Sequence, residues 1–112
     1  MLARANRITR GADYKTVVRG GGRCAGAHTV MYVVTTPHMR SPRFGFIVSK
    51  RVGSAVVRNT VRRRLKAVCA EALPSVRAGA DVVIRALPSS AAAPYRELRA
   101  EVVRCLGRRA AA

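Results

Sequence analysis

The residues with the strongest chemical character lie between positions 50 and 66, where every charged side chain is a cation. They are Lys50, Arg51, Arg58, Arg62, Arg63, Arg64 and Lys66. Like charges four residues apart on a helix repel each other by about 0.2–0.5 kcal/mol, and no acid in the stretch offsets that repulsion. A surface of one sign is stabilised by a partner of the opposite sign. The pattern therefore indicates binding to phosphates, as in a nucleic acid.

An apolar stripe with helical spacing runs through the same part of the chain. Its members recur every three or four residues and are Val57, Val61, Leu65, Val68, Cys69 and Ala72. At about 100° per residue, a second set falls together on the opposite side of the helix: Asn59, Arg62, Arg63 and Lys66. We therefore predict a helix over 55–73 with one face for a hydrophobic core and the other for phosphates.

The acids do not form a pattern that supports hydrolysis by this chain alone. A nuclease that uses metal ions needs carboxylates that converge on them, and the five acids are Asp13, Glu71, Asp81, Glu97 and Glu101. Only Glu97 and Glu101 are close in sequence, and we expect both on the solvated side of a helix, with Glu101 near Arg104. The two histidines, His28 and His38, lack the spacing of zinc ligands. We expect neither catalytic nor metal-binding residues.

Composition places the chain among small nucleic-acid-binding proteins. Its 112 residues suit one domain, 1–112, and 22 Lys and Arg against five acids give a formal net charge of +17. It has neither a long apolar run nor an apolar signal core, so we expect a cytoplasmic protein without a membrane segment. The three cysteines, Cys24, Cys69 and Cys105, have no C-x-x-C spacing, and we expect buried, reduced thiols.

The remaining elements follow from residue alternation and from turn residues. After a basic segment, 1–10, a helix begins near Asp13, and the three glycines at 20–22 end it as a connector. Strands are predicted over 28–36, 43–49 and 81–87. A last helix begins at Pro94 and ends at Gly107, before a tail over 108–112. This order predicts an α+β fold, or α/β sandwich, in which 43–87 forms a βαβ unit if its strands are parallel.

Residues 43–66 resemble the signature of the bacterial ribonuclease P protein subunit, Ser-Lys-(Lys/Arg)-x-Gly-x-Ala-Val-x-Arg-Asn-Arg followed by further basic residues. Here the stretch from Ser49 reads Ser-Lys-Arg-Val-Gly-Ser-Ala-Val-Val-Arg-Asn-Thr. The segments 5–8, 13–18 and 81–86 and the final helix are also similar to that family, so the resemblance covers nearly the whole chain. Two positions depart from it: Thr60 replaces an arginine, and Val18 replaces a common aromatic residue.

The resemblance implies a fold and a function. The fold is an α/β sandwich with a left-handed βαβ crossover, against the general preference for right-handed crossovers. The function is that of a protein subunit that assists a catalytic RNA in cleaving the 5′ leader from precursor tRNA. Magnesium is bound mainly by the RNA subunit. The implied partners are ribonuclease P RNA and precursor tRNA, with no membrane and no small-molecule substrate.

The resemblance also implies two sets of site residues. The RNA-subunit set is Lys50, Arg51, Arg58, Asn59, Arg62, Arg63, Arg64 and Lys66. The leader set lies in a cleft between the first helix and the sheet and comprises Arg7, Arg10, Tyr14, Lys15, Val18 and Tyr32. Aromatic rings there stack on unpaired bases, each stack being worth about 1–3 kcal/mol. The sequence leaves open whether Phe44 and Phe46 belong to the core or to the cleft.

Two other classes of function remain to be weighed. Small basic α/β domains are common among structural ribosomal proteins, so a ribosomal RNA-binding role is the alternative. Identification of the co-purifying RNA would distinguish this role from that of a ribonuclease P subunit. A DNA-binding role lacks support, because the sequence contains no recognisable helix-turn-helix or zinc-finger pattern.

Overall fold

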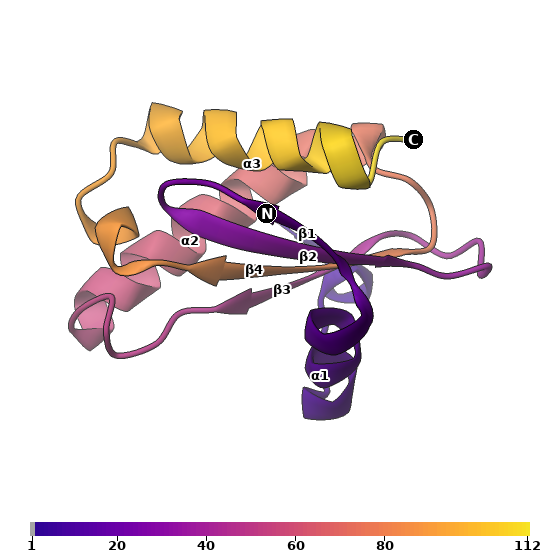
Figure 1. The fold of residues 1–112 in the computed structure, drawn as a ribbon, viewed down its shortest axis with the longest axis horizontal. Helices are drawn as coiled ribbons and strands as arrows, with labels where there is room; N and C mark the ends of the chain where they lie inside the picture. Colours follow the sequence, from indigo (N-terminus) through magenta and orange to yellow (C-terminus); the bar gives the residue numbers. More distant parts are fainter. Residues whose placement is uncertain (1) are drawn as a thin grey trace.

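The computed structural model describes residues 2–112 and folds them around a four-stranded sheet (Figure 1). The strands are β1 (Gly22–Ala25), β2 (Thr29–Thr35), β3 (Arg43–Ile47) and β4 (Ala80–Ala86). Their order in space is β1-β2-β4-β3, with β2 antiparallel to both β1 and β4 and with β3 parallel to β4. β1 and β3 are therefore the edge strands. The mixed sheet and its helices confirm the predicted α+β class.

Three helices cover the two faces of this sheet. They are α1 (Gly11–Gly20), α2 (Ala55–Ala72) and α3 (Tyr95–Arg109), with short 3-10 turns η1 (Arg4–Asn6), η2 (Leu73–Ser75) and η3 (Pro88–Ala91). Figure 1 shows α3 above the sheet and α1 below it. Among residues 2–112, no helix has the length and apolar character needed to cross a bilayer.

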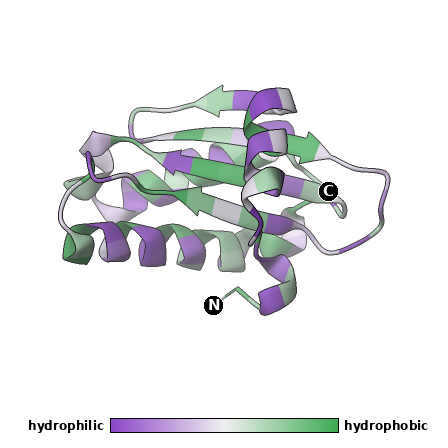
Figure 2. Ribbon diagram, turned by 90° about the horizontal axis from the view of Figure 1, so that it is seen from below, coloured by the Kyte–Doolittle hydropathy of each residue, from purple (hydrophilic) through white to green (hydrophobic). Residues whose placement is uncertain are grey.

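The larger core lies between the sheet and the helices α2 and α3. Four members of the predicted stripe of α2 are buried there, with Leu65 and Cys69 fully enclosed, while Val57 and Ala72 are partly buried against the same cluster. Leu106 of α3 belongs to this cluster too. A smaller cluster on the opposite face joins Val17 of α1 to Val83 of β4. Figure 2 shows the consequence, because the strands are mainly hydrophobic while the helices alternate between hydrophobic and hydrophilic residues. Each helix therefore keeps one face for contacts outside the core.

The segment from β3 through α2 to β4 is the predicted βαβ unit, and its strands are parallel neighbours. Ser54 begins α2 as its N-cap, and its hydroxyl oxygen accepts a hydrogen bond from the Val57 N–H at 3.3 Å. The helix ends at Ala72, one residue before the predicted end. The left-handed crossover implied by the family resemblance stays a prediction.

The structure corrects the predictions around the glycines. The sequence predicted a flexible connector at 20–22, whereas Gly20 closes α1 and Gly22 begins β1, a strand that was not predicted. Gly21 is needed there because a Cβ atom would lie 2.5 Å from the Val17 carbonyl oxygen. At the other end of the chain, α3 continues through Gly107 to Arg109, and Pro94 is its N-cap instead of its first residue.

The expectation of reduced thiols is confirmed for Cys69 but wrong for Cys24 and Cys105, and the expected solvated position of Glu101 on α3 is also wrong. Cys24 and Cys105 form a disulfide, and only Cys69 is a free thiol within residues 2–112. Burial raises the pKa of the Cys69 thiol. Glu101 does not pair with Arg104, because its carboxylate accepts hydrogen bonds from the backbone and side chain of the β1–β2 turn. Helical spacing alone did not show that this side of α3 faces a hairpin.

A buried acid holds together the start of the two parallel strands. The carboxylate of Asp81 on β4 accepts two hydrogen bonds from Arg43 on β3, at 3.0 and 2.9 Å, and two from Arg40 in the preceding loop. Arg43 also lies 3.6 Å from the carboxylate of Asp13 on α1. Burial disfavours the charged form of Asp81, but the hydrogen bond and charge of Arg43 and the charge of Arg40 outweigh it. The pKa of Asp81 is therefore below its ordinary value.

We predict that Asp81→Asn destabilises the fold by about 1–3 kcal/mol at neutral pH, because the variant cannot make hydrogen bonds between charged groups. A carboxylate whose pKa is lowered by folding stabilises the protein above its unfolded pKa, and this contribution is lost as the pH falls through the folded pKa. The unfolding free energy of the unaltered chain should thus decrease more between about pH 5 and pH 2 than that of the variant. Denaturant unfolding across this pH range measures both. Parallel pH profiles would contradict the assignment, and Glu71→Gln at the exposed pair with Arg99 is the control.

Candidate nucleic-acid interface

Two neighbouring cavities lie where the N-terminal segment meets α2 and β3. The larger, of about 650 Å³, is lined by Leu2, Arg7, Asn59, Arg62, Arg63, Lys66 and Ala67. The smaller, of about 140 Å³, is lined by Arg7, Ile8, Thr9, Tyr14, Phe44, Phe46, Arg62 and Lys66. Arg7, Arg62 and Lys66 line both, so the two cavities adjoin at these side chains, and we treat them as one surface. We call it the cationic groove.

Helix α2 supplies one wall of the groove because its opposite side is buried. Val61 and Leu65 point into the core, so Arg62 and Lys66 are placed at the surface, half-buried along their stems. Arg62 donates a hydrogen bond to the Asn59 side-chain oxygen at 3.3 Å. The predicted clustering of Asn59, Arg62, Arg63 and Lys66 on one face is thus observed.

The N-terminal segment supplies the second wall, and hydrogen bonds to β3 and to the residue before it fix its position. The Ile8 N–H donates to the Phe44 carbonyl at 2.9 Å, and the buried Asn6 amide donates to the Pro42 carbonyl at 2.8 Å. The Arg7 guanidinium donates to the Leu2 carbonyl at 2.9 Å. The sequence showed no sign that Leu2 lines the groove, since one apolar residue in a basic segment has no periodic partner.

Tyr14 reaches the groove from α1 by lying on Gly45 of β3. A Cβ atom at position 45 would lie 2.6 Å from carbons of the tyrosine ring, so the ring requires glycine beneath it. The Tyr14 hydroxyl oxygen accepts a hydrogen bond from the Phe46 N–H at 3.2 Å. Phe44 is fully buried in the larger core, and Phe46 is half-buried and packs against the same core. Both rings also line the smaller cavity, so each belongs to the core and to the edge of the groove.

The rest of the predicted leader set lies outside the lining of the groove. Val18 and Tyr32 are half-buried in the smaller core cluster around Val17 and Val83. Tyr32 is on β2, which β4 separates from β3. Arg10 and Lys15 are exposed near the start of α1, and neither lines the two cavities. The structure thus brings Arg7 and Tyr14 together with the α2 cations and leaves the other members apart.

Members of the predicted RNA-subunit set also differ in position. Arg64 donates to the Ala93 carbonyl at 3.3 Å, on the side of α2 that faces the start of α3. Lys50 and Arg51 are exposed in the turn before α2, and Arg58 is half-buried. Thr60 donates to the Val56 carbonyl of its own helix, so this position adds no donor to the groove. Asn59, Arg62, Arg63 and Lys66 are the members that share one surface.

The charge of the groove is not compensated from within the chain. Neither lining set contains an acid, and each of the five acids is engaged elsewhere. Asp13 and Asp81 face Arg43, Glu71 pairs with Arg99, and the two glutamates of α3 contact the β1–β2 turn. In the part of the chain from residue 2 onward, no three His, Cys, Asp or Glu side chains gather in a way that could hold a metal ion. The groove therefore combines cations with aromatic rings and, within the described residues, has no carboxylate in its lining, an arrangement that suits phosphates and unpaired bases.

Comparisons with known proteins match nearly the whole chain. A family model described as Ribonuclease P matches residues 2–110. The "Ribonuclease P protein component" of Clavibacter michiganensis subsp. michiganensis is 47% identical over 108 residues, covering 96% of each chain. That of Acidothermus cellulolyticus is 46% identical, covering 96% of this chain and 91% of the relative.

Solved structures extend the agreement to the fold. The RNase P protein of Staphylococcus aureus superposes with a TM-score of 0.83 at 22% identity, covering 94% of both chains. The RNase P protein of Thermotoga maritima gives 0.80 at 18% identity, covering 91% of this chain and 96% of the other. At such identities these structures support the fold alone, whereas the family model and the curated relatives cover nearly the whole sequence. The chain belongs to the ribonuclease P protein family.

Proposed function

We propose that this chain is the RNA-binding subunit of ribonuclease P and that its cationic groove holds the 5′ leader of precursor tRNA beside ribonuclease P RNA. The observation that carries the proposal is the meeting of Tyr14 and Phe46 with Arg7, Arg62 and Lys66 in one depression. Proteins that bind single strands combine cations along the phosphates with aromatic rings under the bases. A leader is unpaired, so its bases are available for such stacking.

The α2 cations at the junction of the two cavities suit a contact to folded RNA. Arg62 and Lys66 line both cavities, whereas Asn59 and Arg63 line only the larger one. Folded RNA is recognised mainly through its backbone and shape, which suits a surface of guanidinium and amide groups. We infer that Asn59 and Arg63 face the RNA subunit while Arg62 and Lys66 lie between that RNA and the leader.

The proposal leaves the metal with the RNA. Magnesium supplies an activated water and stabilises the developing charge in phosphodiester cleavage, and it is bound through oxygen ligands. The carboxylates of this chain are engaged with cations or with the β1–β2 turn, so the donor set does not favour a magnesium site on the protein. The chain contributes cations that reduce repulsion between phosphates. We place this activity in the cytoplasm, as part of the same proposal.

We predict that the protein without RNA cleaves no precursor tRNA and that it strongly stimulates cleavage by ribonuclease P RNA at low magnesium. The reason is that phosphate repulsion, which magnesium otherwise screens, is relieved by a polycation. The measurement is single-turnover cleavage across a magnesium titration, with and without the protein. Cleavage by protein freed of RNA, or a stimulation that does not depend on magnesium concentration, would contradict the prediction.

We predict that Arg62→Ala and Lys66→Ala each weaken binding to ribonuclease P RNA. Each should reduce the slope of log affinity against log salt by about 0.7–0.9 for every phosphate that the variant no longer neutralises. Melting temperatures should change little, because both side chains lie opposite the buried stripe. Arg104→Ala on α3 is the matched control, since Arg104 is exposed and lines no part of the groove. A large decrease in stability with unchanged RNA affinity would show that the face of α2 is wrongly assigned.

We predict that Tyr14→Ala reduces the preference for precursor over leaderless tRNA by about 1–3 kcal/mol, the value of one aromatic–base stack. Affinity for the RNA subunit should change little. Binding constants of the holoenzyme for long-leader and leaderless tRNA measure both effects. Equal reductions in affinity for the two substrates would mean that Tyr14 acts only as a packing residue.

The structure supplies two controls for this measurement. Tyr14→Phe keeps the ring but leaves the Phe46 N–H without its partner, so it should retain leader preference with a small decrease in stability. Gly45→Ala keeps the tyrosine and pushes its ring away from β3, so it should reduce the preference in the same direction as Tyr14→Ala. If Tyr14→Phe keeps the leader preference and Gly45→Ala reduces it, the preference depends on the position of the ring. If Tyr14→Phe reduces it as well, the preference depends on the hydroxyl.

A further inference from the structure

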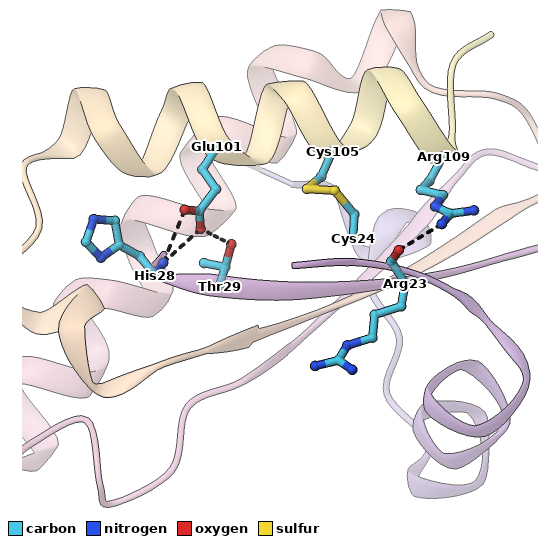
Figure 3. Close-up of a disulfide and its surroundings, with 7 residues drawn as sticks. All are labelled: Arg23, Cys24, His28, Thr29, Glu101, Cys105 and Arg109. Atoms are coloured by element: carbon cyan, nitrogen blue, oxygen red, sulfur yellow. Dashed lines mark hydrogen bonds between the residues drawn. A yellow bond between two sulfur atoms is a disulfide. The ribbon is translucent and has the colours of Figure 1, made fainter. Parts of the chain in front are cut away.

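The disulfide joins an edge strand to the last helix on the side of the molecule away from the groove. Cys24 is on β1 and Cys105 is on α3, with 5.7 Å between their Cα atoms and a separation of 81 residues in sequence. Figure 3 shows the bond between the helix and the hairpin formed by β1 and β2. None of the residues that line the groove comes from β1, β2 or α3.

Polar contacts hold the same two elements together on both sides of the disulfide. One turn before Cys105, Glu101 accepts hydrogen bonds from the His28 N–H at 3.1 and 3.2 Å and from the Thr29 hydroxyl. One turn after Cys105, Arg109 donates to the Arg23 carbonyl at 3.0 Å. These contacts, drawn in Figure 3, do not need the sulfur–sulfur bond. Reduced Cys24 and Cys105 would therefore remain facing each other in a folded chain.

The three cysteines differ in their access to reagents. Cys69 is fully enclosed on α2, where burial raises the pKa of its thiol and so suppresses the reactive thiolate. Cys24 keeps 7% of its surface exposed, against 1% for Cys105, and it lies on a strand with no outer neighbour. Exchange with a small thiol is thus directed to the sulfur of Cys24, through a local opening of the edge strand.

We infer that Cys24 and Cys105 form a site of reversible thiol–disulfide exchange that sets the stability of the hairpin–α3 end and leaves the groove unchanged. In reduction, the thiolate of a small thiol such as glutathione attacks the Cys24 sulfur, the bond to Cys105 breaks, and Cys105 leaves as a thiolate that takes up a proton. A second small thiol attacks the mixed disulfide at the small molecule's sulfur. It releases the Cys24 thiol and a small-molecule disulfide. Oxidation is the reverse exchange.

The two redox states differ in the unfolded chain as well as in the folded one. A crosslink across 81 residues restricts the unfolded chain strongly, and such crosslinks stabilise small proteins. We expect the oxidised chain to melt about 10 °C or more above the reduced chain. The redox state should not alter leader preference, and this expectation rests on the proposed function. The expected thiol count and melting temperature do not depend on the proposed function.

The experiment equilibrates the full chain in glutathione buffers of graded potential, blocks free thiols after denaturation, and counts them by mass spectrometry. We expect one blocked cysteine, Cys69, at the oxidising end and three at the reducing end, with the melting temperature following the same curve. The holoenzyme's preference for long-leader over leaderless tRNA should be equal at both ends. Cys69→Ala should keep the redox dependence of melting, and the double variant Cys24→Ala, Cys105→Ala should abolish it.

Three results would overturn the inference. They are three free cysteines at every potential, a melting temperature independent of redox state, and a leader preference that changes with it. The titration of the unaltered chain decides the first two even if the double variant does not fold. A leader preference that is absent at both ends would count against the proposed function alone, because the thiol count and melting curve would still stand.

Discussion

The outer edge of β3 has no neighbouring strand, so its backbone groups must find other partners. The N-terminal segment meets this need through the Ile8 N–H, and α1 meets it through the hydroxyl of Tyr14. Both segments are thereby held beside α2, which follows β3 in the chain after a turn that contains Gly53. One unpaired edge thus gathers three separate parts of the chain, and the cationic groove is the space between them.

The division of α2 into two faces gives that space its charge. Val61 and Leu65 are fixed in the core, so the helix must present Arg62 and Lys66 to the groove. The acids that would neutralise these cations are engaged in holding the fold together, most clearly Asp81 between Arg40 and Arg43. The acids of the chain are therefore engaged in structural contacts, and the cations of the groove remain without an acidic partner within residues 2–112. A groove with this charge attracts phosphates.

Local patterns predicted the parts of the structure that depend on neighbours in sequence. The stripe of α2, strands β2, β3 and β4 and the shared face of Asn59, Arg62 and Lys66 all follow from periodicity. Contacts between distant segments were not predictable in this way. The disulfide to Cys105 and the anchoring of Glu101 each depend on α3 lying over a hairpin 81 and 73 residues away in sequence. The strand β1 is a local partner of β2 and was missed because its glycines were interpreted as a connector. Residues such as Tyr32 were placed in the site by resemblance, and the fold puts them across β4 from it.

The central claim is that the leader lies along the edge of β3, between α1 and α2. The most direct measurement is photo-crosslinking from 4-thiouridine placed at single positions of the leader in a precursor tRNA bound to the holoenzyme, with the attached peptides mapped by mass spectrometry. We expect crosslinks in the segments that contain Tyr14 and Phe46. Crosslinks confined to α3 or to β1, with none at the groove, would contradict the account.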